Sequence, residues 1–183
     1  MMPSSQSRPR ATPSGHTTLI ADAREGRPEA LATLYRRHAR ELLAVAYRLL
    51  QSADDAEDVV HDVFVGLPEA LRRYEERGTL AAWLKTITVR VALARLRKAR
   101  PWIELEELQV AAPEHGHEGR VALERAVGTL TPGLRAVLVL KEVEGFSHGE
   151  IAEMLGISVG ASEVRLHRAL RALRAQLMKG ELP

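Results

Sequence analysis

One stretch near the C-terminal end of the chain, Phe146–Ser158, carries the signals for a helix, a tight turn and a second helix. Ser147 and Glu150 are spaced as a capping box, in which each side chain accepts a hydrogen bond from the backbone of the other residue. Gly156 suits the left-handed conformation that ends a helix, and Ser158 suits the cap of the next one. The pattern predicts a helix-turn-helix, whose second helix normally enters the major groove of DNA. An ordinary helical hairpin is the alternative.

The helix that follows the turn combines an apolar stripe with a row of arginines. The residues expected to face inward are Val159, Ser162, Leu166, Ala169, Leu170, Leu173 and Leu177. The arginines recur at three-residue steps, which after a helix-turn-helix favours contact with DNA phosphates over a solvated face. Residues near the helix start are placed to reach base edges, where an arginine can bind guanine with two hydrogen bonds. The candidate DNA-reading residues are Ser158, Gly160, Ala161, Glu163, Val164, Arg165, Arg168 and Arg171.

Helical periodicity also dominates the first half of the chain, and no segment of the sequence alternates as a strand would. Pro28 suits the first turn of a helix, and Ser52 and Thr79 are plausible caps of two later helices. In the helix after Thr79, the apolar stripe comprises Leu80, Trp83, Leu84, Ile87, Val91, Ala94 and Leu96. The sequence therefore predicts an all-α fold.

Proline, glycine and charge divide the chain into four parts. We expect two small helical domains, at residues 17–100 and 120–179, joined by a flexible acidic linker at 101–119. Residues 1–16 are rich in Pro, Ser and Arg and predict a disordered basic tail. Fully extended, the linker would span roughly 60 Å, which is close to two turns of duplex DNA.

The net charge is only +2, but the charges are segregated along the chain. Residues 85–100 hold six bases and no acid, whereas residues 52–64 hold five acids and no base. Asp54, Asp58 and Asp62 follow at four-residue steps on one helix face, where like charges repel. Such blocks indicate one surface for a polyanion and another for a basic protein partner. Solvated helix faces are the alternative.

Several classes of protein are disfavoured by what the sequence lacks. The chain has no cysteine, which excludes a disulfide framework and a thiolate metal site. Its N-terminus has no long apolar core after the positive charges, and no apolar run approaches the roughly 20 residues of a membrane-spanning helix. We therefore expect a soluble, cytoplasmic protein without membrane insertion.

Three motifs in series carry a resemblance to a known family. Asp54–Phe64 reads DDAEDVVHDVF, Thr79–Leu84 reads TLAAWL, and Leu130–Arg168 begins with Leu-Thr-Pro and contains the predicted helix-turn-helix. In these segments and in their order, the chain resembles bacterial sigma factors of the extracytoplasmic-function (ECF) group, within the sigma-70 family. The resemblance implies a promoter-specific initiation factor for RNA polymerase that performs no catalysis, needs no cofactor and takes no small-molecule substrate.

The resemblance also implies where the partners bind. The first domain would dock on the clamp of core RNA polymerase through Asp54, Asp55, Asp58, Val59, His61 and Asp62. It would open the minus-ten promoter element, with the loop 74–80 holding flipped bases. We expect Trp83 in the core, and a stacking platform for a base is the alternative. The residues assigned to minus-ten DNA are Tyr74, Lys85, Arg90, Arg95, Arg97 and Lys98. The second domain would read the minus-thirty-five element, and an anti-sigma factor is a further partner that the family implies.

Several positions depart from the family pattern, among them His61, which stands where a glutamine is usual. Arg90 stands where an asparagine is usual, and Ala94 stands where an aspartate is usual. In the second domain, Ser162 replaces an inward valine, which should loosen packing slightly, and Glu163 replaces a lysine. Glu163 could repel the DNA backbone or accept a hydrogen bond from cytosine N4. The promoter sequence therefore does not follow from the resemblance.

Two rival functions remain open from the sequence. A conventional helix-turn-helix regulator with a helical sensing or dimerisation domain would bind DNA without polymerase. A helical metal enzyme would use histidines and carboxylates such as those of Glu114–Glu118, but that spacing does not form a helical two-histidine site. The clamp-helix motif favours the sigma factor over both.

Overall fold

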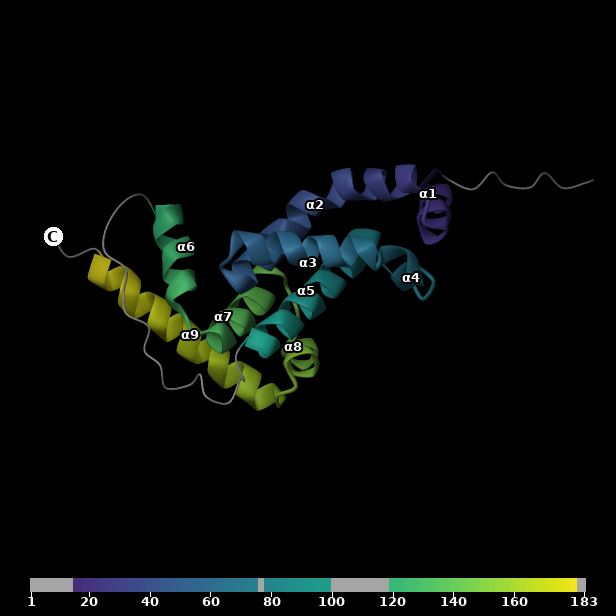
Figure 1. The fold of residues 1–183 in the computed structure, drawn as a ribbon. Helices are drawn as coiled ribbons and strands as arrows, with labels where there is room; N and C mark the ends of the chain where they lie inside the picture. The colour runs from purple at the N-terminus through teal and green to yellow at the C-terminus, as the bar shows by residue number, and fades with distance from the viewer. Residues whose placement is uncertain (1–14, 76–77, 100–118, 181–183) are drawn as a thin grey trace, which may run out of the picture.

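The computed structural model describes residues 15–75, 78–99 and 119–180, and every element in these ranges is helical (Figure 1). The first domain contains α1 (Gly15–Arg24), α2 (Pro28–Leu50), α3 (Ala53–Val65), α4 (Leu67–Leu71) and α5 (Leu80–Ala99). The second domain contains α6 (Gly119–Thr129), α7 (Pro132–Leu138), the π-helical turn η2 (Val139–Val143), α8 (His148–Leu155) and α9 (Val159–Gly180). The all-α prediction is confirmed. Most of the predicted tail and nearly all of the predicted linker lie outside the described residues.

Helices in the first domain begin where the sequence indicates. Pro28 is in the first turn of α2. The Ser52 hydroxyl accepts a hydrogen bond from the Asp55 N–H at 3.2 Å, and the Thr79 hydroxyl accepts one from the Ala82 N–H at 3.2 Å. Each cap satisfies a backbone donor that has no partner within its helix. These caps fix the starting points of the two helices that carry the candidate sites of this domain, α3 and α5.

The core of the first domain lies between α1, α2, α3, α4 and α5. Its buried residues are Ile20, Ala23, Ala30, Leu34, Ala39, Leu42, Val60, Val63, Leu67, Leu71, Tyr74, Leu80 and Leu84. Trp83, Ile87 and Val91 pack against this cluster, as the predicted stripe of α5 requires. Burying a Val, Leu or Ile side chain of this cluster contributes about 2 kcal/mol to the hydrophobic stabilisation of the domain.

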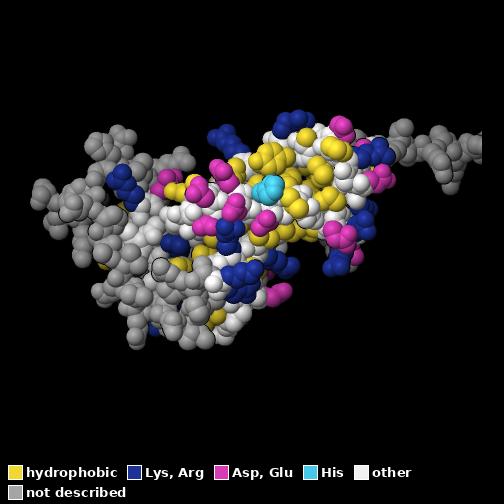
Figure 2. Space-filling model, in the orientation of Figure 1, with side chains coloured by type: hydrophobic (Ala, Val, Ile, Leu, Met, Phe, Trp, Pro, Cys, Tyr) yellow, Lys and Arg dark blue, Asp and Glu magenta, His cyan; other side chains and the backbone are white. Residues whose placement is uncertain are grey.

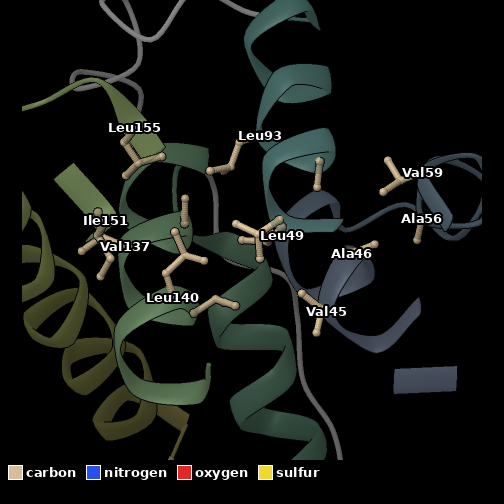
Figure 3. Close-up of a cluster of buried hydrophobic side chains, with 14 residues drawn as sticks. Val45, Ala46, Leu49, Ala56, Val59, Leu93, Val137, Leu140, Ile151 and Leu155 are labelled. Carbon is tan, nitrogen blue, oxygen red and sulfur yellow. The ribbon is translucent and has the colours of Figure 1, made fainter. Parts of the chain in front are cut away.

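A second buried cluster joins the two domains (Figure 3). The first domain contributes Val45, Ala46, Leu49, Ala56, Val59, Val89, Ala92 and Leu93 to it. The second domain contributes Ala136, Val137, Val139, Leu140, Ile151 and Leu155. Helices α7 and α8 therefore lie against α2 and α5 (Figure 1). The two domains are closed on each other, an arrangement that the sequence did not indicate.

A buried arginine fastens this closed arrangement. The Nε atom of Arg135 donates to the Leu49 carbonyl at 3.0 Å, and its Nη1 atom donates to the Gly128 and Leu130 carbonyls at 3.1 Å each. These carbonyls lie at the C-terminal ends of α2 and α6, where helix carbonyls lack intrahelical partners and a positive charge is favourable. Burial lowers the pKa of Arg135 to about 10, which leaves it charged at neutral pH. Arg135 thus caps a helix from each domain.

The inward face of α9 differs in part from its predicted stripe. Ser162, Ala169 and Leu173 are buried as expected. Val159 and Leu170, however, are exposed to 47% and 41%, and Leu177 is also exposed, so this part of the prediction is wrong. A stripe that includes these residues would require neighbouring helices on both sides of α9. In the described structure α9 packs on α6, α7 and α8, which cover a narrower face.

Candidate nucleic-acid and protein interfaces

The helix-turn-helix is built as its sequence predicts. The Ser147 hydroxyl accepts from the Glu150 N–H at 3.3 Å, and the Glu150 carboxylate accepts from the Ser147 N–H at 2.8 Å. Gly156 ends α8 in the left-handed conformation, with φ of 67°. The Ser158 hydroxyl accepts from the Ala161 N–H at 3.1 Å and caps α9. The predicted capping box and turn are confirmed.

The capping box makes part of the stability of this motif depend on pH. The hydrogen bonds from the Ser147 side chain and backbone lower the pKa of Glu150, so its stabilising effect is present at neutral pH and is lost as pH falls through that lowered pKa. We expect Glu150→Gln to lower the unfolding midpoint near pH 7, and the difference from wild type to vanish in acid. Denaturant unfolding followed by circular dichroism at both pH values measures this. A pH-independent difference would contradict the capping role.

A hydrogen bond explains the unusual residue Ser162. Its side chain is fully buried, and its hydroxyl lies 2.9 Å from Nδ1 of His148 at the start of α8. The sequence predicted a slightly looser packing here, because a hydroxyl replaces an apolar side chain. The contact with His148 instead satisfies the buried hydroxyl and joins the two helices of the motif. Sequence reasoning missed His148 because the partner lies on the preceding helix.

The candidate DNA-reading residues lie between the cap of α9 and its fourth turn, and they mostly face solvent. Ser158, Gly160, Glu163, Val164, Arg168 and Arg171 are exposed, whereas Ala161 and Arg165 are half-buried. Val164 is 51% exposed, which leaves its methyl groups free to contact a thymine methyl. The contacts of these residues with DNA remain predictions.

The acidic helix α3 is partly neutralised within the molecule. Arg95 of α5 places Nε 2.7 Å from Asp55 and Nη2 2.7 Å from Asp58. The repulsion inferred from the acidic row therefore does not by itself require a basic partner. Arg95, predicted to contact DNA phosphates, is bound to two residues predicted to contact polymerase. Asp54, His61 and Asp62 are exposed on the same helix.

The structure corrects one residue of the predicted protein-binding surface and shows two exposed apolar side chains on the same helices, α2 and α3. Val59 is fully buried where α3 packs on α2 and α5 of its own domain, so its side chain cannot contact a partner. Val65, at 68% exposure, and Tyr35, at 47%, are large apolar side chains that face solvent. The ring of Tyr35 packs edge-on against that of Phe64, with 4.9 Å between the centroids. Figure 2 shows a hydrophobic patch over α2 and α3 with acidic side chains beside it.

The loop before α5 is anchored by a buried tyrosine. Tyr74 is 7% exposed, its ring centroid lies 4.7 Å from that of Trp83, and its hydroxyl donates to the Gly78 carbonyl at 3.3 Å. Tyr74 was predicted to contact flipped bases, but the structure places it in the core, because its ring completes the packing around Trp83. Its role in this state is to hold the loop. Residues 76–77 lie outside the described residues.

The basic face of α5 is not fully open to solvent. Lys85 lies 3.0 Å from Glu41 of α2 and 3.3 Å from Glu144 of the second domain. The hydrogen bond to Glu41 is the main reason why the pKa of Lys85 is raised. Arg90 lies 4.0 Å from Glu153 on α8. Arg97 and Lys98, near the end of the helix, are exposed. The predicted DNA-binding residues of α5 are thus divided between paired and exposed groups.

Within the described ranges there is no cluster of three or more histidine, cysteine or carboxylate side chains that could hold a metal ion. Across the same residues, no helix is both long and apolar enough to cross a membrane. The Glu114–Glu118 segment, which suggested a metal site, lies outside the described residues. The candidate sites of the structure are the three surfaces described above: the exposed face of α3, the basic face of α5 and the start of α9.

Comparison with known proteins matches this arrangement. The family model Sigma-70 region 2 matches residues 34–101, and the model Sigma-70, region 4 matches residues 120–173. The ECF RNA polymerase sigma factor SigE of Mycolicibacterium smegmatis is 31% identical over 93% of this chain and 70% of its own length.

Two solved structures share the fold. CnrH, in complex with the cytosolic domain of CnrY, is 30% identical with a TM-score of 0.53, over 90% of this chain and 97% of that chain. RpoE of Bartonella quintana, in complex with the anti-sigma factor NepR, is 24% identical with a TM-score of 0.57, over 80% of this chain and 96% of that chain. The second likeness bears on the fold alone.

The chain is all-α, with an acidic helix, a basic helix and a capped helix-turn-helix, and both family models match it. These features together identify a bacterial transcription initiation factor. The chain belongs to the ECF group of RNA polymerase sigma factors, within the sigma-70 family. It acts with core RNA polymerase and promoter DNA to start transcription at specific promoters. The resemblance drawn from the three sequence motifs is confirmed.

Proposed function

We propose that the three surfaces divide the work of promoter recognition between the two domains. The α3 face, with Asp54, His61 and Asp62, docks on the polymerase clamp together with the apolar side chains of Tyr35 and Val65. The basic face of α5 binds the phosphates of the melted minus-ten element. The start of α9 reads the minus-thirty-five element. On this proposal the functional domains are residues 17–100 and 120–179.

One observation carries this division more than any other. An exposed apolar patch lies beside a row of carboxylates on α2 and α3, while the basic residues of α5 and α9 are on other elements. Apolar side chains at the centre of a surface and charges at its border are typical of protein–protein interfaces. Helices rich in exposed arginine and lysine, such as α5 and α9, are typical of contact with nucleic acid. The chemistry of each surface therefore suits a different partner.

Run-off transcription with core RNA polymerase and a library of promoter templates tests the proposal. We expect transcripts that require both the factor and a subset of templates. If core polymerase binds the factor but no template gives a factor-dependent transcript, the proposed function is wrong. The rival regulator predicts tight binding of the isolated protein to duplex DNA, whereas a sigma factor binds duplex promoter weakly without core enzyme. A duplex binding assay with and without core distinguishes the two.

Three finer properties belong to the same proposal. The factor itself performs no catalysis, since polymerase makes the RNA, and it acts in the cytoplasm, where polymerase and promoters are. An anti-sigma partner is also proposed, and the solved complex of CnrH, 30% identical, with the cytosolic domain of CnrY supports a protein partner besides polymerase. Stoichiometric co-purification of a protein that blocks core binding would establish such a partner.

A further inference from the structure

Carboxylates of the second domain lie against the basic face of α5. Glu144, which directly follows η2, is 3.3 Å from Lys85 and 3.0 Å from Arg48 of α2. Glu153 of α8 is 4.0 Å from Arg90. Lys85 and Arg90 are the two α5 residues assigned to minus-ten DNA that face the second domain. In the closed molecule Lys85 is ion-paired with a nearly buried carboxylate, whereas Arg90 has an exposed carboxylate at 4.0 Å.

The local backbone directs Glu144 into this position. The Glu144 N–H donates to the Val139 carbonyl at 3.0 Å, which closes a π-helical turn that is wider than an α-helical one. The side chain of Glu144 that leaves this turn is only 2% exposed, although both of its cationic partners come from the other domain. Glu142, two residues earlier, is exposed. The π-helical turn therefore directs Glu144 toward the first domain, whereas Glu142 remains exposed to solvent.

The charges around Glu144 balance. Arg48 and Lys85 supply two positive charges, and Glu144 and Glu41 supply two negative charges. A nearly buried carboxylate with two cationic partners is stabilised by charge-assisted hydrogen bonds, whereas removing it would leave both cations without their interdomain partner. The apolar cluster beside it, with Val89 and Leu93 of α5, covers more of the same helix. The ion pairs of Glu144 and the apolar cluster therefore both hold the second domain against α5.

We propose that the basic face of α5 is a shared surface, bound by Glu144 and Glu153 in the closed molecule and by DNA phosphates in the open one. This inference rests on the proposed role of α5 in binding the minus-ten element. Glu144 acts as an intramolecular latch that competes with DNA for Lys85. The two domains must separate before the minus-ten strand can bind, and DNA that occupies α5 favours the open state in return, because the coupling is reciprocal.

Two latch variants and one matched control test the proposal in the full chain. Glu144→Gln removes the charge of the latch, Arg48→Gln removes a partner that lies outside the DNA-binding residues, and Glu142→Gln removes an equal charge from an exposed position. The chain has no cysteine, so cysteines introduced at the exposed residues Ala32 and Met178 can carry a donor and an acceptor dye. Energy transfer between the dyes reports closure, and random-sequence single-stranded DNA is the binding probe.

We expect Glu144→Gln and Arg48→Gln to lower energy transfer and to raise the affinity for the probe by about tenfold, with Glu142→Gln like wild type. The probe should also lower energy transfer in the wild type. Unchanged energy transfer in both latch variants, with normal helicity by circular dichroism, would overturn the latch. Reduced energy transfer without a gain in affinity would overturn the shared surface. Only this inference fails if the wild type gives factor-dependent transcripts and the latch variants bind the probe with wild-type affinity. The proposed function fails if the wild type gives no factor-dependent transcript.

Discussion

Replacing Arg135 with methionine should lower the free energy of unfolding by about 3 kcal/mol. The substitution keeps an unbranched apolar chain in the buried site but removes the donor for three backbone carbonyls, those of Leu49, Gly128 and Leu130. A buried carbonyl left without a donor costs about 1–3 kcal/mol, and relief from burying a charge offsets part of the sum. Urea unfolding of the full chain, followed by circular dichroism, gives the midpoint and the slope.

Arg37→Met is the matched control for this prediction, because Arg37 is an exposed arginine on α2. Its substitution should change the free energy of unfolding by no more than about 0.5 kcal/mol. If both variants unfold at the same denaturant concentration, the three carbonyls do not depend on Arg135. A lower slope for Arg135→Met alone would indicate that the two domains then unfold separately.

Local signals predicted the elements well because they depend on neighbouring residues. The capping box of Ser147 and Glu150, the left-handed Gly156 and the caps at Ser52 and Thr79 are all formed as expected. Each depends on hydrogen bonds within a few residues, which a sequence pattern can specify. The helix-turn-helix was therefore predictable from the sequence.

Contacts between distant elements were not predictable in the same way. The predicted stripe of α5 omitted Val89, Ala92 and Leu93, which are buried in the cluster that both domains share and therefore lie outside a stripe that faces one neighbour. Val59 was likewise assigned to an exposed surface, but it is buried where α3 packs on α2 and α5. The pairing of Arg95 with α3 is also a contact between elements, at a separation of about forty residues.

The apolar patch beside α3 was missed for a different reason. Tyr35 and Phe64 fit the helical periodicity of a core, and periodicity alone does not tell which edge of an apolar stripe extends onto the surface. Single exposed apolar residues are common, but a contiguous patch bordered by acids indicates an interaction site. Val65, the most exposed of these side chains, has no charged or polar atom that would favour its contact with water.

Val65→Asp should weaken binding to core RNA polymerase by about thirtyfold or more, because an apolar residue central to an interface contributes about 2 kcal/mol and the new charge adds a desolvation cost. Val65 is 68% exposed, so the substitution should leave the unfolding midpoint near that of wild type. Met178→Asp, at 64% exposure on α9, is the matched control and should bind core normally. Titration of labelled factor with core enzyme measures both affinities. Equal affinities for the two variants would place the polymerase interface elsewhere and leave the patch on α2 and α3 without this role.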